Sequence, residues 1–229
     1  AEKLLSSIDI SEITASWEGL AQARLLLNRD PKDALKVLSK IVEELRTGED
    51  QNLISGALNL LSQSQAICGD IDSAIETQYE SLAIKVSVDN IVGQANGHHN
   101  LLQFSKQNDN LESALSHASR IVELVREIQD REWEMNALAD LAHLLACDEQ
   151  FDLAEQNFRL SIDLAEENEN LIASVIAHWG VADLAMIRGD GQMALEHYSQ
   201  ALAAQMQTGR PAPPELIQRI DAITNGENS

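Results

Sequence analysis

The sequence is poor in aromatic residues and proline, and it has no long apolar run. Phe, Trp and Tyr make up 3% of 229 residues and there are four prolines, whereas apolar residues reach 44%. This balance favours a soluble helical protein with a continuous core. No run approaches the roughly 18 apolar residues that a membrane-spanning helix needs, and no secretory-type stretch follows Glu2 and Lys3. We therefore expect a cytoplasmic protein without a membrane partner.

Cysteine is equally scarce. Cys68 and Cys147 each precede a cluster of turn-forming residues and lie far apart in the sequence. A disulfide between them is not expected, and reduced, half-buried thiols suit a cytoplasmic protein.

Motifs for chemistry are absent as well. The chain has no phosphate loop, no glycine-rich dinucleotide turn and no HExxH. His98 and His99 are neighbours, but on a helix their side chains would point roughly 100° apart, which prevents them from sharing an ion. His98 and His178 fall in the same repeat column, which favours a packing role. We expect no enzyme activity, no cofactor and no metal.

What the sequence does have is a repeat of 40 residues. Alanine recurs at this interval five times, at Ala34, Ala74, Ala114, Ala154 and Ala194. Two further columns are apolar in all five copies, eight residues after and thirteen residues before each alanine. A period in this range indicates a stacked repeat array. A small residue in this column lets two antiparallel helices approach closely.

Polar turn-forming residues cluster four to six residues before most of these alanines, as in Gly69-Asp70 and Gly189-Asp190-Gly191. Glycine and asparagine tolerate the left-handed conformation that ends a helix, and aspartate suits the N-cap of the next helix. Each 40-residue unit is therefore predicted to be helix, tight turn, helix.

The repeat resembles the tetratricopeptide repeat (TPR), whose second helix carries a small residue, an aromatic residue and another small residue. The residues that resemble the motif are Ala154, Phe158 and Ser161, then Ala194, Tyr198 and Ala201, and in the first helices Leu141-Ala142 and Val181-Ala182. Gln78 and Ala118 stand in place of the aromatic residue, and the 40-residue period exceeds the usual TPR length of about 34. The pattern is similar to the longer-helix variants of kinesin light chain, LGN and bacterial TPR regulators.

The resemblance implies an all-α fold, a right-handed superhelical α-solenoid of five helix-turn-helix repeats in a single domain, 1–229. The repeats are expected at 11–50, 51–90, 91–130, 131–170 and 171–210. After the proline-rich break a capping helix is expected at 214–225, with Leu216, Ile217, Ile220 and Ile223 on its apolar face.

Apolar residues at the start of the chain are in phase with the second helices of the repeats. Residues 1–8 are thus expected to be the last turns of a preceding repeat in a longer protein, or a short N-terminal helix.

The family resemblance also implies that the first helices line a concave face that binds a peptide. Candidate side chains on that face are Asn59, Gln63, Asn96, His99, Gln103, Asn136, His143, Trp179 and Asp183. Side-chain amides both donate and accept hydrogen bonds, which suits the backbone of an extended peptide. The alternative is that these are solvated residues on an exposed face.

The net charge limits the kinds of partner that the chain would attract. The net charge of −21 repels nucleic acid and attracts basic partners, whereas the candidate columns are nearly neutral. We expect a basic or amphipathic peptide or protein and not a strongly acidic one. Lys106 is interpreted as the one cation of the concave face, which argues against the TPR subtype that clamps a C-terminal carboxylate.

Three functions fit these observations. The first is a scaffold that binds a peptide or a partner helix in its groove. The second is a ligand-sensing or signal-peptide-sensing module of a larger, bacterial-type regulator, and the third is a unit that self-assembles into a homo-oligomer.

Overall fold

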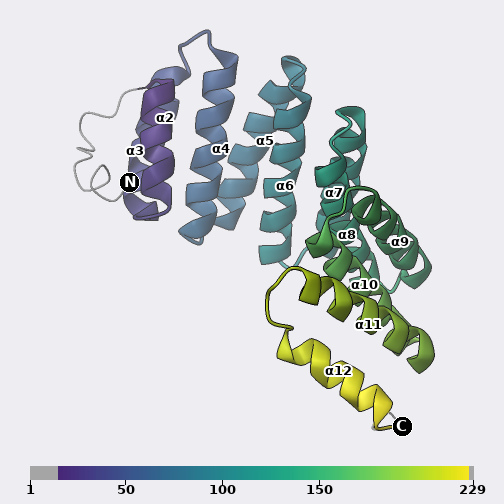
Figure 1. The fold of residues 1–229 in the computed structure, drawn as a ribbon. Coiled ribbons are helices and arrows are strands. Elements are labelled where there is room, and N and C mark those ends of the chain that lie inside the picture. Colours follow the sequence, from purple (N-terminus) through teal and green to yellow (C-terminus); the bar gives the residue numbers. More distant parts are fainter. Residues whose placement is uncertain (1–14, 227–229) are drawn as a thin grey trace. The chain divides into compact units, whose positions relative to one another are not determined.

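The computed structural model describes residues 15–226, and every regular element in that range is an α-helix (Figure 1). This confirms the predicted all-α class. The helices are α2 (Trp17–Leu27), α3 (Pro31–Leu45), α4 (Gln51–Ile67), α5 (Ile71–Ser87), α6 (Ile91–Gln107), α7 (Leu111–Glu127), α8 (Arg131–Cys147), α9 (Phe151–Glu167), α10 (Leu171–Ile187), α11 (Gly191–Gln207) and α12 (Pro214–Thr224).

The helices follow a stricter rule than the 40-residue repeat. From α4 to α11 each helix has 17 residues, and each begins 20 residues after the one before it. The structural period is therefore 20 residues, a helix plus a three-residue turn. Two such units form one predicted hairpin repeat.

The turn between α4 and α5 shows how three residues suffice. Gly69 has φ 91°, the left-handed conformation that glycine adopts without steric cost. The backbone N–H of Asp70 then donates to the carbonyl of Gln65 at 3.0 Å, which closes α4. The carboxylate of Asp70 also accepts from the N–H of Ser73 and caps α5. One residue thus ends one helix and begins the next.

The same left-handed residue recurs every 20 positions, but most copies are not glycine. Asp89, Asp109, Gln129, Glu149 and Glu169 have φ between 50° and 59°. A non-glycine residue in this conformation costs about 1–2 kcal/mol. The turns are therefore maintained by the flanking caps and the packing of the helices, and not by local preference alone.

The repeated alanines form one of the best-buried columns of the chain. All five are at most 1% exposed, as expected for small residues where two helices approach closely. The two accompanying apolar columns are also buried, apart from exposed Ala21 and half-buried Leu202.

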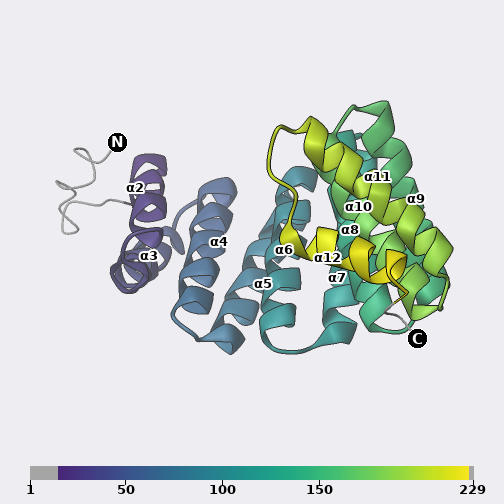
Figure 2. The same cartoon turned by 60° about the horizontal axis from the view of Figure 1, so that its bottom comes forward.

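Helix contacts divide the chain into two compact units, unit 1 up to residue 124 and unit 2 from residue 125, with the boundary inside α7. In unit 1, α4 pairs with α5, and the first helices α2, α4 and α6 contact one another in sequence. Figure 2 shows these first helices along one side of unit 1 and α3 and α5 along the other. In unit 2, α8 pairs with α9, α10 pairs with α11, and the first helices α8 and α10 are in contact. A single domain spanning 1–229 stays a prediction.

The last helix, α12, lies against α11 at the end of unit 2 (Figure 2). Leu216 is fully buried in a cluster with Tyr198, and Ile220 and Ile223 pack against it. The predicted cover is therefore present. Ile217 is 43% exposed, so its assignment to the buried face was wrong, because it follows Leu216 by only one residue and so points away from α11.

The two cysteines are more exposed than the sequence led us to expect. Cys68 and Cys147 are free thiols but are exposed, so half-burial was wrong, because both lie at the outer ends of helices where the chain turns. The predicted role of residues 1–8, and the predicted start of the first repeat at residue 11, lie outside the described residues.

Candidate functional site

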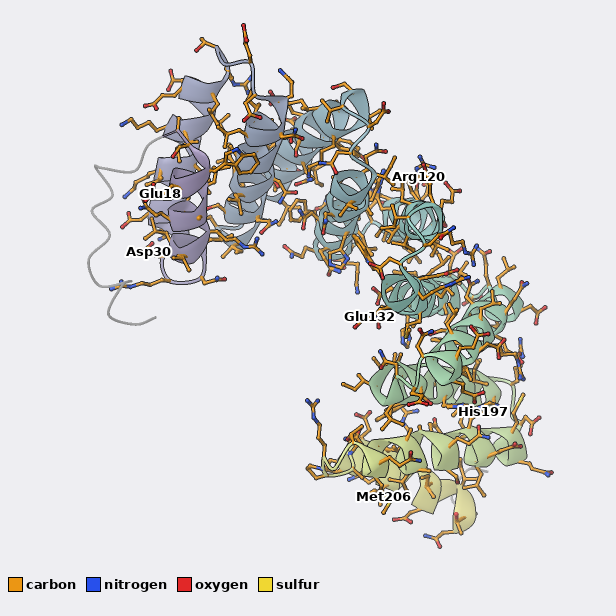
Figure 3. The ribbon with its side chains drawn as sticks, turned by 45° about the horizontal axis from the view of Figure 1, so that its top comes forward. Glu18, Asp30, Arg120, Glu132, His197 and Met206 are labelled. Carbon is orange, nitrogen blue, oxygen red and sulfur yellow. The ribbon has the colours of Figure 1, made fainter. Side chains whose placement is uncertain are left out.

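A hollow in unit 1 lies between its first helices. It has a volume of about 770 Å³ and is lined by residues of α2, α4 and α6, together with Asn90 and, from α5, Lys85. Glycines Gly56 and Gly93 form part of its wall, and Trp17 stands at its edge with 58% of its surface exposed. None of the lining residues is acidic. Figure 3 places Glu18 and Asp30, two carboxylates of the α2–α3 hairpin, and neither lines the hollow.

A network of amides forms the inner wall of this pocket. The side-chain oxygen of Asn59 accepts from Lys85 Nζ at 3.0 Å, from Asn100 Nδ2 at 3.0 Å and from Gln78 Nε2 at 3.3 Å. Gln78 Oε1 in turn accepts from Ser62 Oγ at 2.5 Å. Gln78 and Ser62 are fully buried, so the network anchors the polar side chains that reach the pocket.

Lys85 is the unusual member of this network. It is 5% exposed, and among the described residues its ammonium donates a hydrogen bond to Asn59 alone. Burial lowers the pKa of the Lys85 ammonium to about 8, because the charged form is poorly solvated there. A cation at this depth normally has a carboxylate partner.

The pocket contains three of the predicted site residues, Asn59, Gln63 and Asn96. Asn96 is exposed and donates only to the carbonyl of Val92 in its own helix. The Gln63 amide forms no hydrogen bond to any described residue and faces the pocket. Both side chains are thus able to bond to a ligand.

The other predicted residues lie elsewhere. His99 and Gln103 are half-buried on α6 and do not line the pocket. Asn136 belongs to unit 2, where its amide donates to the carbonyl of Glu132 in the same way as that of Asn96 donates to Val92.

Three predicted residues of unit 2 already have protein partners. His143 meets the ring of Phe158 edge-on, with centroids 4.8 Å apart. Trp179 packs against the cluster that contains Leu216 of α12. Asp183 accepts a hydrogen bond from the Tyr198 hydroxyl and pairs with Arg219 of α12 at 2.7 Å. Burial and the Asp183 carboxylate both raise the pKa of Tyr198. The contacts of Trp179 and Asp183 hold the covering helix in place.

Lys85 was missed because only the first helices were searched for binding residues. A sequence signal was present, since three of the four other residues in the repeat column of Lys85, namely Leu45, Val125 and Ala165, are apolar, and all three are buried. The view of Lys106 as the one cation of this face was also wrong, because Arg24 and Lys85 line the pocket and Lys106 does not.

Two histidine pairs recur 80 residues apart on the hairpins. His98 and His117 have their Nδ1 atoms 3.1 Å apart, and His178 and His197 have theirs 2.9 Å apart. Figure 3 marks His197 on α11. Burial, with a smaller contribution from the neighbouring histidine, lowers the pKa of His98 and of His178 to about 4, so each pair is neutral near pH 7. This agrees with the packing role expected for the column.

A second, smaller hollow of about 500 Å³ lies in unit 2, and its lining includes the carboxylates of Glu132 and Glu169. No group of three or more His, Cys, Asp or Glu side chains within residues 15–226 is arranged to hold a metal ion. Over the same range, no helix combines the length and apolarity that crossing a membrane requires.

Comparison with known proteins identifies the fold. No protein-family model matches the sequence, and no curated protein matches it significantly. Solved structures do match. BtubC (BKLC) from P. vanneervenii is 17% identical, with a TM-score of 0.73, over 86% of this chain and 83% of that chain. A putative kinesin light chain with nearly identical TPR-like repeats from Podosopora anserina is 16% identical, with a TM-score of 0.71, over 84% and 95%.

A third similar structure is larger than this chain. It is a signal transduction ATPase (STAND) protein with a tetratricopeptide repeat sensor from Pyrococcus horikoshii, 14% identical, with a TM-score of 0.71, over 90% of this chain and 30% of that one. The shared features are the consecutive antiparallel helices and their hairpin packing. The chain therefore has the fold of the tetratricopeptide-repeat proteins, as its alanine interval and second-helix motif predicted.

Proposed function

We propose that the chain is a binding scaffold and not an enzyme, and that the pocket of unit 1 holds an extended peptide segment of a protein partner. The observation that carries the proposal is the set of amide side chains between the first helices. Among the described residues, Gln63 has no hydrogen-bond partner and Asn96 bonds only within its own helix. An extended peptide needs partners for its own N–H and C=O groups, and amides supply both kinds.

The acidic exterior adds a preference for the flanks of the partner. The chain carries 37 acidic and 16 basic residues, so basic or amphipathic flanking sequence would be attracted to it. Nucleic acid would be repelled. A cytoplasmic location, as expected from the sequence, suits such a scaffold and stays a prediction.

The test is selection of peptides on the whole chain, followed by calorimetry with the peptides selected. Asn96→Ala and Gln63→Ala are each expected to weaken binding about tenfold, because each removes one bond to the peptide backbone. The matched control is Asn157→Ala, since Asn157 is half-buried on α9, outside the pocket, and makes the same intrahelical bond, Nδ2 to the carbonyl of Leu153. Selected peptides that bind Asn96→Ala and Gln63→Ala as tightly as the original chain would contradict the proposal.

A sensor function is the second candidate, favoured by the similarity to a repeat sensor that forms part of a larger ATPase. It requires an attached effector domain, so the complete reading frame decides it. Self-assembly, the third expectation, is addressed by light scattering over a range of concentrations, where a strict monomer would exclude it.

A further inference from the structure

The core of the second repeat contains polar residues where most of the other repeats are apolar. At the column of Lys85 three of the four other copies are Leu45, Val125 and Ala165, each at most 8% exposed, and the fourth is the half-buried Gln205 of the last repeat. At the column of Gln78 they include the fully buried Phe158 and Tyr198. Substituting polar groups at core positions costs stability. Such local exceptions to the repeat pattern are where a functional site is expected.

The charge of Lys85 is not balanced inside the protein. An ammonium has three donors, and Lys85 uses one of them, toward the Asn59 oxygen that Gln78 and Asn100 already share. No carboxylate of the described residues pairs with it. By contrast, the buried carboxylate of Glu134 is bonded by both Arg126 and Arg131 at 2.7 Å. Lys85 is thus a 95% buried cation with donor capacity to spare, beside an open pocket.

Other residues around the pocket add to its positive charge. Arg24 lines its outer part, is exposed, and has no hydrogen bond or ion pair with a described residue. No acidic side chain lines the pocket, although acidic residues outnumber basic ones 37 to 16 in the chain. The pocket is therefore an electropositive spot on an acidic protein.

We propose that this pocket binds a carboxylate of the partner peptide, with Lys85 as the ionic partner at its base and Arg24 as a second cation at its edge. The inference deepens the proposed peptide-binding function and rests on it. A single carboxylate carries one negative charge, which would balance the positive charge of the buried Lys85 ammonium. The amides around Lys85 can donate to the same oxygens. The acidic exterior disfavours a multiply charged ligand. The carboxylate can belong to an Asp or Glu side chain or to a peptide C-terminus.

Three pools of randomised nine-residue peptides separate these sources. One pool has a single glutamate and an amidated C-terminus, the second has no acidic residue but a free C-terminal carboxylate, and the third has neither. The whole chain is expected to bind one of the two carboxylate pools at least about tenfold more tightly than the third pool. The preferred pool identifies the source.

Lys85→Met is expected to abolish this preference and leave weak binding of the third pool unchanged. Lys106→Met is the matched control, because Lys106 is exposed on α6 outside the pocket, and it should behave like the original chain. The melting temperature provides a second readout. A buried charge without a counter-charge destabilises the fold, so Lys85→Met should melt at the same temperature or higher, whereas a purely structural lysine would lower it when lost.

The outcomes separate the two proposals. Equal binding of all three pools, unaffected by Lys85→Met, overturns the carboxylate assignment and leaves peptide binding in place. Binding of none of the pools overturns both. A phosphoserine pool bound more than about tenfold more tightly than both carboxylate pools also overturns the assignment. If Lys85→Met does not fold, Lys85→Gln replaces it, because its amide removes the charge and keeps a polar group beside Asn59.

Discussion

Replacing Gly180 by alanine tests the close packing of α10 against α9 in unit 2. Gly180 lies in the middle of α10, and the ring of Phe158 from α9 covers its α-carbon. A Cβ built on Gly180 would lie 2.7 Å from Cε2 of that ring and nearer still to Cζ and Cε1. Phe158 is 1% exposed, so its ring has no free space into which to move.

Two effects of opposite sign decide the result. Alanine stabilises a helix interior relative to glycine by about 0.5–1 kcal/mol. Forcing an extra methyl group into a packed core costs about 1–3 kcal/mol. The second effect is larger, so Gly180→Ala should lower the free energy of unfolding by about 0.5–2 kcal/mol. Where the methyl group has room, only the first effect remains.

Gly56 of α4 provides that comparison. A Cβ there would meet Leu20 at 3.5 Å and Trp17 at 3.7 Å, which are ordinary van der Waals contacts. Gly56→Ala should therefore raise the free energy of unfolding by about 0.5–1 kcal/mol. Both variants are measured by urea denaturation followed by circular dichroism.

A double variant identifies the cause. If Phe158 creates the cost, Phe158→Leu in the Gly180→Ala background should be less destabilising than the sum of the two single changes, because the shorter side chain removes the clash. A Gly180→Ala chain as stable as Gly56→Ala would refute the packing described for α9 and α10.

Further predictions concern the histidine pairs, the alanine column and the turns. Between pH 6.5 and pH 4 the free energy of unfolding should fall as the pH falls, because the unfolded chain binds protons that native His98 and His178, with pKa values of about 4, do not. Allowing for partial solvent exposure, about 1–2 kcal/mol per pair is expected in acid titrations of stability, and His98→Gln with His178→Gln should flatten the curve. Ala114→Leu should cost about 1–3 kcal/mol in denaturation experiments, since Ala114 is 1% exposed at a helix contact. Glu149→Gly should raise the melting temperature, with a gain of about 0.5–1 kcal/mol, because Glu149 has φ 59°; an unchanged melting temperature would mean that the turn is unstrained.

The helices were predictable because their signals are local and repeated. An aspartate or asparagine caps most helices at 20-residue intervals, as at Asp50, Asp70 and Asn90, and the alanine column marks each hairpin contact. The shorter period was not recognised because apolar columns differ between first and second helices. The cap residues do recur at this 20-residue period. The exposure of Ile217 required the position of α12 against α11, which no local pattern supplies.

The candidate site was predictable only in part, for a physical reason. Of the nine side chains predicted from columns in the first helices, three line the hollow of unit 1, namely Asn59, Gln63 and Asn96. Columns cannot show which of these groups are already bonded. Asp183 satisfies the same spacing rule as Gln63, yet its carboxylate holds Tyr198 and Arg219 of its own chain. Whether a polar group is available to a ligand depends on contacts between elements distant in sequence.

Polar core residues are distributed unequally between the two units. Unit 2 has the full set of aromatic and small residues at its hairpin contacts, with Phe158 against Gly180 and Tyr198 fully buried. In unit 1 the same column contains Gln78, and a lysine replaces an apolar residue seven positions later. A stack whose repeats contact mainly their neighbours can tolerate one weakened repeat, because its cost is local. The loss of stability caused by Gln78 and Lys85 is therefore limited to the second repeat and the hairpins next to it.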